Sequence, residues 1–141
     1  MSKLLEYLQR IKGEKIRSDR PRSQSFSVVD VDERKQHVMI RFESGTSLYL
    51  HFRVFNAVID YLVENQNRFV RIGATNKVSK DRDTLEWVIQ QTDGSSTHTR
   101  RAPFVCDLLQ VCGFVEYGFA LNPYSGRMNQ AVKWVARGWI K

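Results

Sequence analysis

The densest group of residues that could perform chemistry is a run of acids followed by a lysine near the first quarter of the chain. Asp30 and Asp32 precede the triplet Glu-Arg-Lys at 33–35, and Asp19 lies further upstream. Paired carboxylates with an acid–x–lysine triplet are typical of nucleases that use a divalent cation to activate water. Here the triplet falls in a charged loop between two short predicted strands, whereas that chemistry requires residues held on a rigid sheet edge. A metal-dependent nuclease is therefore our third-ranked hypothesis.

Histidine and cysteine give no further catalytic motif. His37, His51 and His98 are far apart in sequence, without a cysteine or carboxylate at ligand spacing, so the sequence predicts no metal site. Cys106 and Cys112 are six positions apart on a predicted helix, which places them about 9 Å apart and excludes a disulfide between them. The chain also has no glycine-rich phosphate loop. We therefore expect a protein that is not an enzyme and needs no cofactor.

The charge favours an anionic partner. The chain of 141 residues has 22 Lys and Arg against 15 Asp and Glu, a formal net charge of +7. Basic residues exceed acidic ones by four in each of the segments 1–25 and 97–141, whereas the middle segment has one more acid than bases. Such a distribution is typical of proteins that bind nucleic acid through basic ends, although basic termini also serve only to keep a chain in solution.

The first half of the chain predicts a helix, a basic arm and a sheet covered by a second helix. Apolar residues at helical spacing predict an amphipathic helix over 3–11, and residues 14–25 read as an extended basic arm with almost nothing to bury. Short runs rich in Val, Ile and aromatic residues predict an antiparallel meander of three strands, packed on a helix over 51–65. The predicted strands are 26–31, 38–42 and 47–50, with a fourth strand at 68–73.

The second half predicts two helices and a hairpin. Asp83 as N-cap with Glu86 three residues later predicts a helix over 84–91 with a capping box. A helix over 99–112, a strand over 114–121 and a turn over 122–126 follow, and the last segment is compatible with either a strand or a short helix. This order of helix, turn, helix and hairpin resembles a winged helix-turn-helix. The resemblance rests on the order and lengths of the elements and implies DNA binding only by analogy.

The helix over 99–112 is the predicted DNA-facing element. Its N-terminal end carries His98, Thr99, Arg100 and Arg101, where free N–H groups and the helix dipole favour phosphate. On a helical wheel the side carrying Cys106, Asp107 and Gln110 is predicted to be exposed, and Arg101 extrapolates onto the apolar side. The arm and the C-terminal hairpin add further contacts. The predicted nucleic-acid contacts are Arg17, Arg20, Arg22, Thr99, Arg100, Arg101, Arg127, Asn129, Gln130 and Lys133.

These patterns together predict an α+β fold, with a small antiparallel meander packed on a helix and then a winged-helix-like unit. We expect a single domain over 1–141, with lobes over 1–82 and 83–141. The preferred hypothesis is a non-catalytic module that binds DNA, or else RNA, with double-stranded DNA preferred. The alternative is a protein-interaction or accessory subunit, which includes a homo-oligomer. No apolar run is long enough for a membrane span or a signal peptide, and two unpaired thiols fit the reducing cytoplasm.

Overall fold

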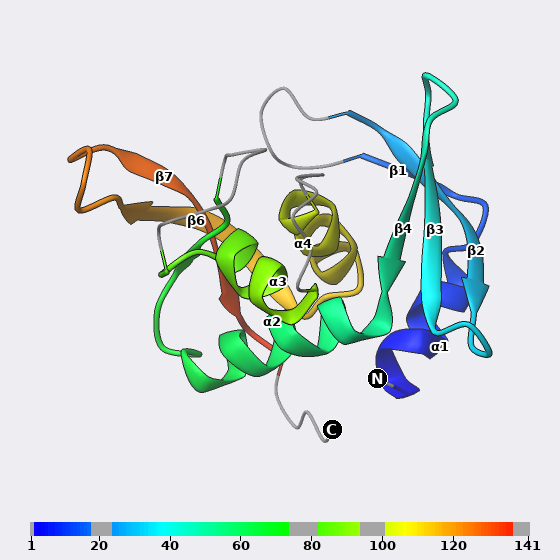
Figure 1. Cartoon of the computed structure of the whole chain (residues 1–141), viewed down its shortest axis with the longest axis horizontal. Coiled ribbons are helices and arrows are strands. Elements are labelled where there is room, and N and C mark those ends of the chain that lie inside the picture. Colours follow the sequence, from blue (N-terminus) through cyan, green and yellow to red (C-terminus); the bar gives the residue numbers. More distant parts are fainter. Residues whose placement is uncertain (1, 18–23, 74–81, 94–100, 137–141) are drawn as a thin grey trace.

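Two antiparallel sheets lie at opposite ends of the molecule, with helices between them (Figure 1). This arrangement comes from a computed structural model, which describes residues 2–17, 24–73, 82–93 and 101–136. The fold of these residues is mixed α+β, as the sequence predicts, with four helices and seven strands in the described ranges.

The first sheet, here called sheet A, contains four strands in the order β1-β2-β3-β4. They are β1 (Lys15–Ile16), β2 (Phe26–Asp32), β3 (His37–Phe42) and β4 (Ser47–His51). Strands β2 to β4 confirm the predicted meander. Strand β1 corrects the prediction of an arm with nothing to bury, because it pairs with β2 and the side chain of Ile16 is buried. A single apolar residue between charged neighbours is too weak a signal to predict a strand.

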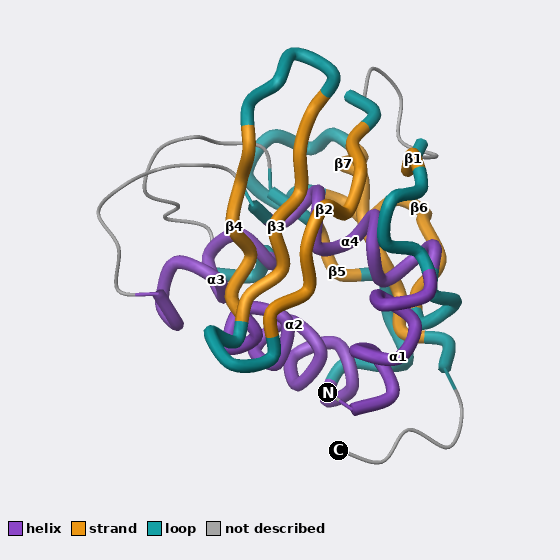
Figure 2. The backbone as a smooth tube through the Cα atoms, turned by 90° about the vertical axis from the view of Figure 1, so that its right-hand side faces the viewer, coloured by secondary structure: helices purple, strands orange, loops and turns teal. Residues whose placement is uncertain are grey.

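The inner face of sheet A packs on helices, which lie behind and beside the sheet in Figure 2. Its buried side chains are those of Ile16, Phe26, Val28, Val31, Val38, Ile40 and Leu50. Contacts to this sheet come from helix α1 (Ser2–Arg10), from the start of α2 (Phe52–Glu64) and from α4 (Ala102–Val111). The ring of Phe104 in α4 packs edge-on against Phe26 and Phe42, at centroid distances of 5.9 and 4.9 Å. Sheet A is therefore covered by three helices rather than by the predicted one.

The second sheet, sheet B, contains three strands in the order β5-β7-β6. They are β5 (Val70–Arg71), β6 (Val115–Leu121) and β7 (Met128–Trp134). The ambiguous last segment of the sequence is thus a strand as far as Trp134. Phe114 stacks on Trp134 and also meets the ring of Tyr7 from α1, each at 5.7 Å. The buried apolar residues of both sheets belong to one continuous core.

Helix α3 (Leu85–Asp93) packs on α2 and begins differently from the prediction. The predicted capping box used Asp83, but the oxygen that accepts the N–H of Trp87 is Thr84 Oγ1, at 3.3 Å. The Asp83 carboxylate instead accepts hydrogen bonds from Tyr61 and Arg68. A tertiary contact therefore outcompetes the local capping interaction.

The buried carboxylate of Glu86 stabilises the start of α4. Its Oε2 accepts the N–H of Ala102, the first residue of that helix, at 2.9 Å. Replacing Glu86 by alanine leaves this N–H without its acceptor in the core. We expect the free energy of unfolding to fall by about 1–3 kcal/mol, measured by urea denaturation. Glu6→Ala removes an exposed glutamate and is the control, and an equal loss in both variants would contradict the role of Glu86.

Candidate functional site

The hairpin of β6 and β7 is the most prominent projection of the structure (Figure 1). Its tip is an ordered turn, in which Asn122 Oδ1 accepts the N–H groups of Tyr124 and Ser125 at 2.9 and 3.3 Å. Asn122 Nδ2 also donates to Asn129 Oδ1 across the strands, at 2.9 Å. The tip presents Tyr124, whose side chain is 80% exposed, and the exposed Arg127. Internal hydrogen bonds therefore order the turn that carries an exposed aromatic ring and a cation at the end of the projection.

One face of this hairpin continues from the core into solvent. Near the body of the protein its side chains are buried or half-buried, and further out Phe119, Leu121 and Met128 are 61, 58 and 60% exposed. Gln130 pairs with Phe119 and lies on the same face, half-buried. Strand β6 is an edge strand of sheet B. An exposed apolar edge of this kind marks a binding surface or an aggregation site.

The opposite face of the hairpin combines one cation, Lys133, and the exposed acid paired with it, Glu116, with an aromatic ring. Lys133 Nζ lies 5.7 Å from the centroid of the Phe69 ring, within the range of a cation–π contact. The Phe69 ring lies across Gly118, where an added Cβ would stand 2.4 Å from a ring carbon. Asn129 lies on the same face, towards the tip. Gly118 is therefore the residue that admits Phe69 to this face.

The structure brings four of the ten predicted contact residues together on the hairpin. These are Arg127, Asn129, Gln130 and Lys133. Arg17 lies apart from them, exposed just after β1. Arg101 is only 8% exposed, which removes it from any surface that could neutralise phosphate. The remaining predicted contacts lie outside the described residues, namely Arg20, Arg22, Thr99 and Arg100.

The predicted exposed side of the 99–112 helix is wrong. Cys106 and Asp107 of α4 are fully buried, and the Asp107 carboxylate accepts a hydrogen bond from the hydroxyl of Tyr117 in β6. Helix α4 lies between sheet A and sheet B and has few exposed side chains. A helix packed between two layers buries its polar side as well as its apolar side. It therefore cannot enter a DNA groove while sheet A covers it.

A second basic surface lies at the β1 edge of sheet A. A groove of about 350 Å³ is lined there by Lys15, Arg41, Glu43 and four neighbouring residues. Lys15 forms an ion pair with Glu43, and the hydrogen bond from Lys15 holds the pKa of that carboxyl below its usual value. Arg17 adds a further positive charge near Glu43. The acid offsets part of the charge, so this surface is less basic than the arm's composition predicts.

A polar network anchors the segment before β5. Arg68 Nη2 donates to Asp83 Oδ1 at 2.9 Å, and the Tyr61 hydroxyl donates to the same oxygen at 2.8 Å. Burial alone would raise the pKa of Asp83, but the hydrogen bonds from Arg68 and Tyr61 outweigh it and lower the pKa. The pKa of Tyr61 is raised, by burial and by its bond to Asp83.

The Asp83 network predicts a loss of stability in acid. Because the folded state lowers the carboxyl pKa, its contribution is present above the ordinary value of 3.8 and is lost as the pH falls below it. We expect Asp83→Asn to remove this part of the acid dependence, at a cost of no more than about 1 kcal/mol at neutral pH, since the ion pair is half-exposed. Thermal melts of both proteins between pH 7 and pH 3 measure this, with Glu64→Gln as the exposed-carboxylate control. Parallel pH profiles for wild type and Asp83→Asn would contradict the assignment.

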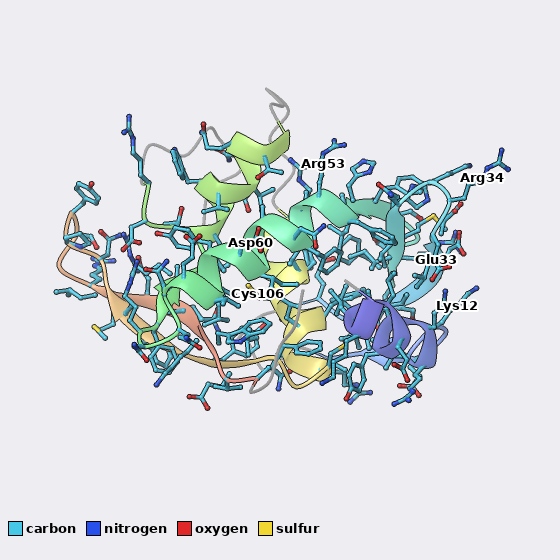
Figure 3. The ribbon with its side chains drawn as sticks, turned by 90° about the horizontal axis from the view of Figure 1, so that it is seen from below. Lys12, Glu33, Arg34, Arg53, Asp60 and Cys106 are labelled. Carbon is cyan, nitrogen blue, oxygen red and sulfur yellow. The ribbon has the colours of Figure 1, made fainter. Side chains whose placement is uncertain are left out.

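The acidic run and the Glu-Arg-Lys triplet at 33–35 lie at the far end of the molecule from the β6–β7 hairpin. Glu33 and Arg34 are in the turn between β2 and β3, near Lys12 (Figure 3). The turn also brings Asp30, Asp32 and His37 together, with one ligand atom of each within 4.8 Å of the others. The prediction that no carboxylate stands at ligand spacing from a histidine therefore missed this group. The signal in the sequence was the Asp-x-Asp alternation followed, across a four-residue turn, by histidine.

The two cysteines are free, as their spacing predicts. Burial raises the pKa of the Cys112 thiol to about 12, so its thiolate is scarce at neutral pH. Cys106 is buried inside the molecule (Figure 3). Neither thiol has the environment of a cysteine nucleophile.

Comparisons of the chain with protein-family models, with curated protein sequences and with solved structures found no match. No helix in the described ranges is both long enough and apolar enough to cross a membrane.

Proposed function

We propose that the protein is a non-catalytic nucleic-acid-binding module that prefers double-stranded DNA and contacts it mainly through phosphates. The observation that carries this proposal is the projecting β6–β7 hairpin, with Arg127 and Tyr124 at its tip and Lys133 and Asn129 on one face. The net charge of +7 supplies the long-range attraction to a polyanion.

The chain order supports the proposal. Helices α3 and α4 are followed by the hairpin of β6 and β7, the order that resembles a winged helix-turn-helix. The burial of α4 changes the mechanism that this resemblance implies. The hairpin, rather than a recognition helix, is the element that we propose to approach the duplex.

In the proposed complex the cations act first. Arg127 and Lys133 neutralise phosphates and release counterions, while the amide of Asn129, on the same face as Lys133, reaches sugar or base edges. The predicted contact Gln130 lies on the opposite face and does not take part in this complex. The exposed Tyr124 ring offers an apolar contact in a groove. Arg17, with the predicted contacts Arg20, Arg22, Thr99 and Arg100, would extend the footprint along the backbone.

Fluorescence anisotropy tests this proposal directly. The purified, nuclease-treated protein is titrated against short double-stranded and single-stranded DNA and RNA at several salt concentrations. We expect double-stranded DNA to bind most tightly, with an affinity that falls steeply as salt rises. The proposal fails if binding to every nucleic acid is absent at physiological salt.

The exposed apolar face of the hairpin favours a second candidate, a protein-interaction subunit. Phe119, Leu121 and Met128 lie side by side on an edge strand and its neighbour. Such a strand can pair with another chain, including a second copy.

Self-association through the hairpin has its own test. If the apolar face pairs two copies, the average mass in solution should rise with concentration, and Phe119→Ser should return the protein to a monomer. Light scattering after size-exclusion chromatography measures this, with Tyr49→Ser as the control at an exposed aromatic residue of sheet A. A monomeric wild type at all concentrations would remove a homo-oligomer from consideration.

A further inference from the structure

We propose that Asp30, Asp32 and His37 form a binding site for a divalent first-row transition-metal ion, with Zn²⁺ as the best chemical match. One carboxylate oxygen from each aspartate and one ring nitrogen of the histidine lie within 4.8 Å of one another. The three side chains are half-buried on the outer face of sheet A, the face away from the helices. The site lies at the opposite end of the molecule from the hairpin and does not rest on the proposed nucleic-acid function.

The backbone explains why these three side chains meet. An irregularity in the pairing of β2 with β3 lies between Val28 and Asp30. It lets Val28 and Val31 both face the core, and so places Asp30 on the outer face together with Asp32. Asp32 pairs directly with His37 across the strands. The cluster is therefore held by two hydrogen-bonded strands, which move little, rather than by a loop.

The chemistry of the donor set selects the kind of ion. Two carboxylate oxygens and one imidazole nitrogen suit Zn²⁺ and its neighbours, whereas Mg²⁺ and Ca²⁺ prefer oxygen ligands alone. Bonds of about 2.0–2.2 Å place the ligand atoms about 3–3.5 Å apart in a tetrahedral site, a contraction that side-chain rotation can supply. Three protein ligands leave a fourth position for water.

A backbone hydrogen bond positions one of the three ligands. The backbone N–H of Lys35 donates to Asp32 Oδ1 at 3.0 Å, which orients this carboxylate. Lys12 Nζ lies 3.7 Å from Asp30 Oδ1, and both side chains are nearly half-exposed. An exposed pair of this length is weak, and a divalent ion would displace the lysine.

Isothermal titration of EDTA-treated protein with Zn²⁺ alone tests the proposal. We expect one ion to bind per chain, and Asp32→Asn and His37→Ala each to weaken that binding at least about 10-fold. Asp30→Asn is a third variant that keeps the shape of the side chain. Asp60→Asn, which removes a carboxylate on α2, is the matched control and should bind like wild type.

Two further measurements on the same samples check that each variant is folded. Circular dichroism should show native spectra for all variants, and Zn²⁺ should raise the melting temperature of wild type and Asp60→Asn but not of His37→Ala. The proposal is overturned if the EDTA-treated protein binds no Zn²⁺. It is equally overturned if folded Asp32→Asn and His37→Ala proteins bind Zn²⁺ as wild type does.

Discussion

Replacing Phe26 by alanine should lower the free energy of unfolding by about 3–5 kcal/mol, the largest loss that we expect from a single substitution. The Phe26 ring is 1% exposed and packs edge-on against both Phe42 and Phe104. Its removal deletes two aromatic contacts and leaves a cavity between sheet A and α4. Urea denaturation measures the loss. Tyr49→Ala, which truncates a half-exposed ring of the same sheet, is the control and should change stability far less.

The same substitution tests whether sheet A seals α4. In a Cys112→Ser background the buried Cys106 is the only thiol, so its rate of alkylation reports how often α4 becomes accessible. We expect Phe26→Ala to raise this rate, with Tyr49→Ala unchanged. Equal alkylation rates with and without Phe26→Ala would show that α4 opens by another route. A fast rate in the Cys112→Ser protein without further substitution would restore α4 as a surface for nucleic acid.

Removing two cations from the hairpin should produce the largest change in nucleic-acid binding. We expect Arg127→Ala with Lys133→Ala to weaken double-stranded DNA binding about 10-fold near physiological salt. The dependence of log affinity on log salt should become shallower by about 2, because two fewer counterions are released. Anisotropy titrations at several salt concentrations measure both quantities.

A matched control separates local contacts from overall charge. Arg34→Ala with Lys35→Ala removes the same charge from the turn of sheet A, at the opposite end of the molecule (Figure 3). If the hairpin is the interface, this variant should bind nearly as tightly as wild type. Equal losses in the two variants would show that the protein responds to net charge alone, and no loss in the hairpin variant would remove the hairpin from the interface.

Local sequence patterns were sufficient to predict most helices and strands. Alternating Val38, Ile40 and Phe42 predicts a strand with one covered face, and Leu4 and Leu8 predict the buried side of α1. These patterns work because the period of a strand or a helix determines which side chains share a face. The same patterns predicted strand β6 and the turn after it, but they left the segment of β7 open between a strand and a short helix.

Only the tertiary structure decided what lies against each face, and hence which residues are available for function. Periodicity identifies the most apolar side of α4, but it does not show that a second layer covers the opposite side and buries Cys106 and Asp107. The place of Arg101 inside the protein, and that of Asp83 in a network with Tyr61, depend on partners distant in sequence. The meeting of Asp30, Asp32 and His37 depends on one irregularity and on strand register, which arise when two strands pair. Sequence therefore determined most of the elements and their charge, whereas the packing of those elements selected the surface on which the charge can act.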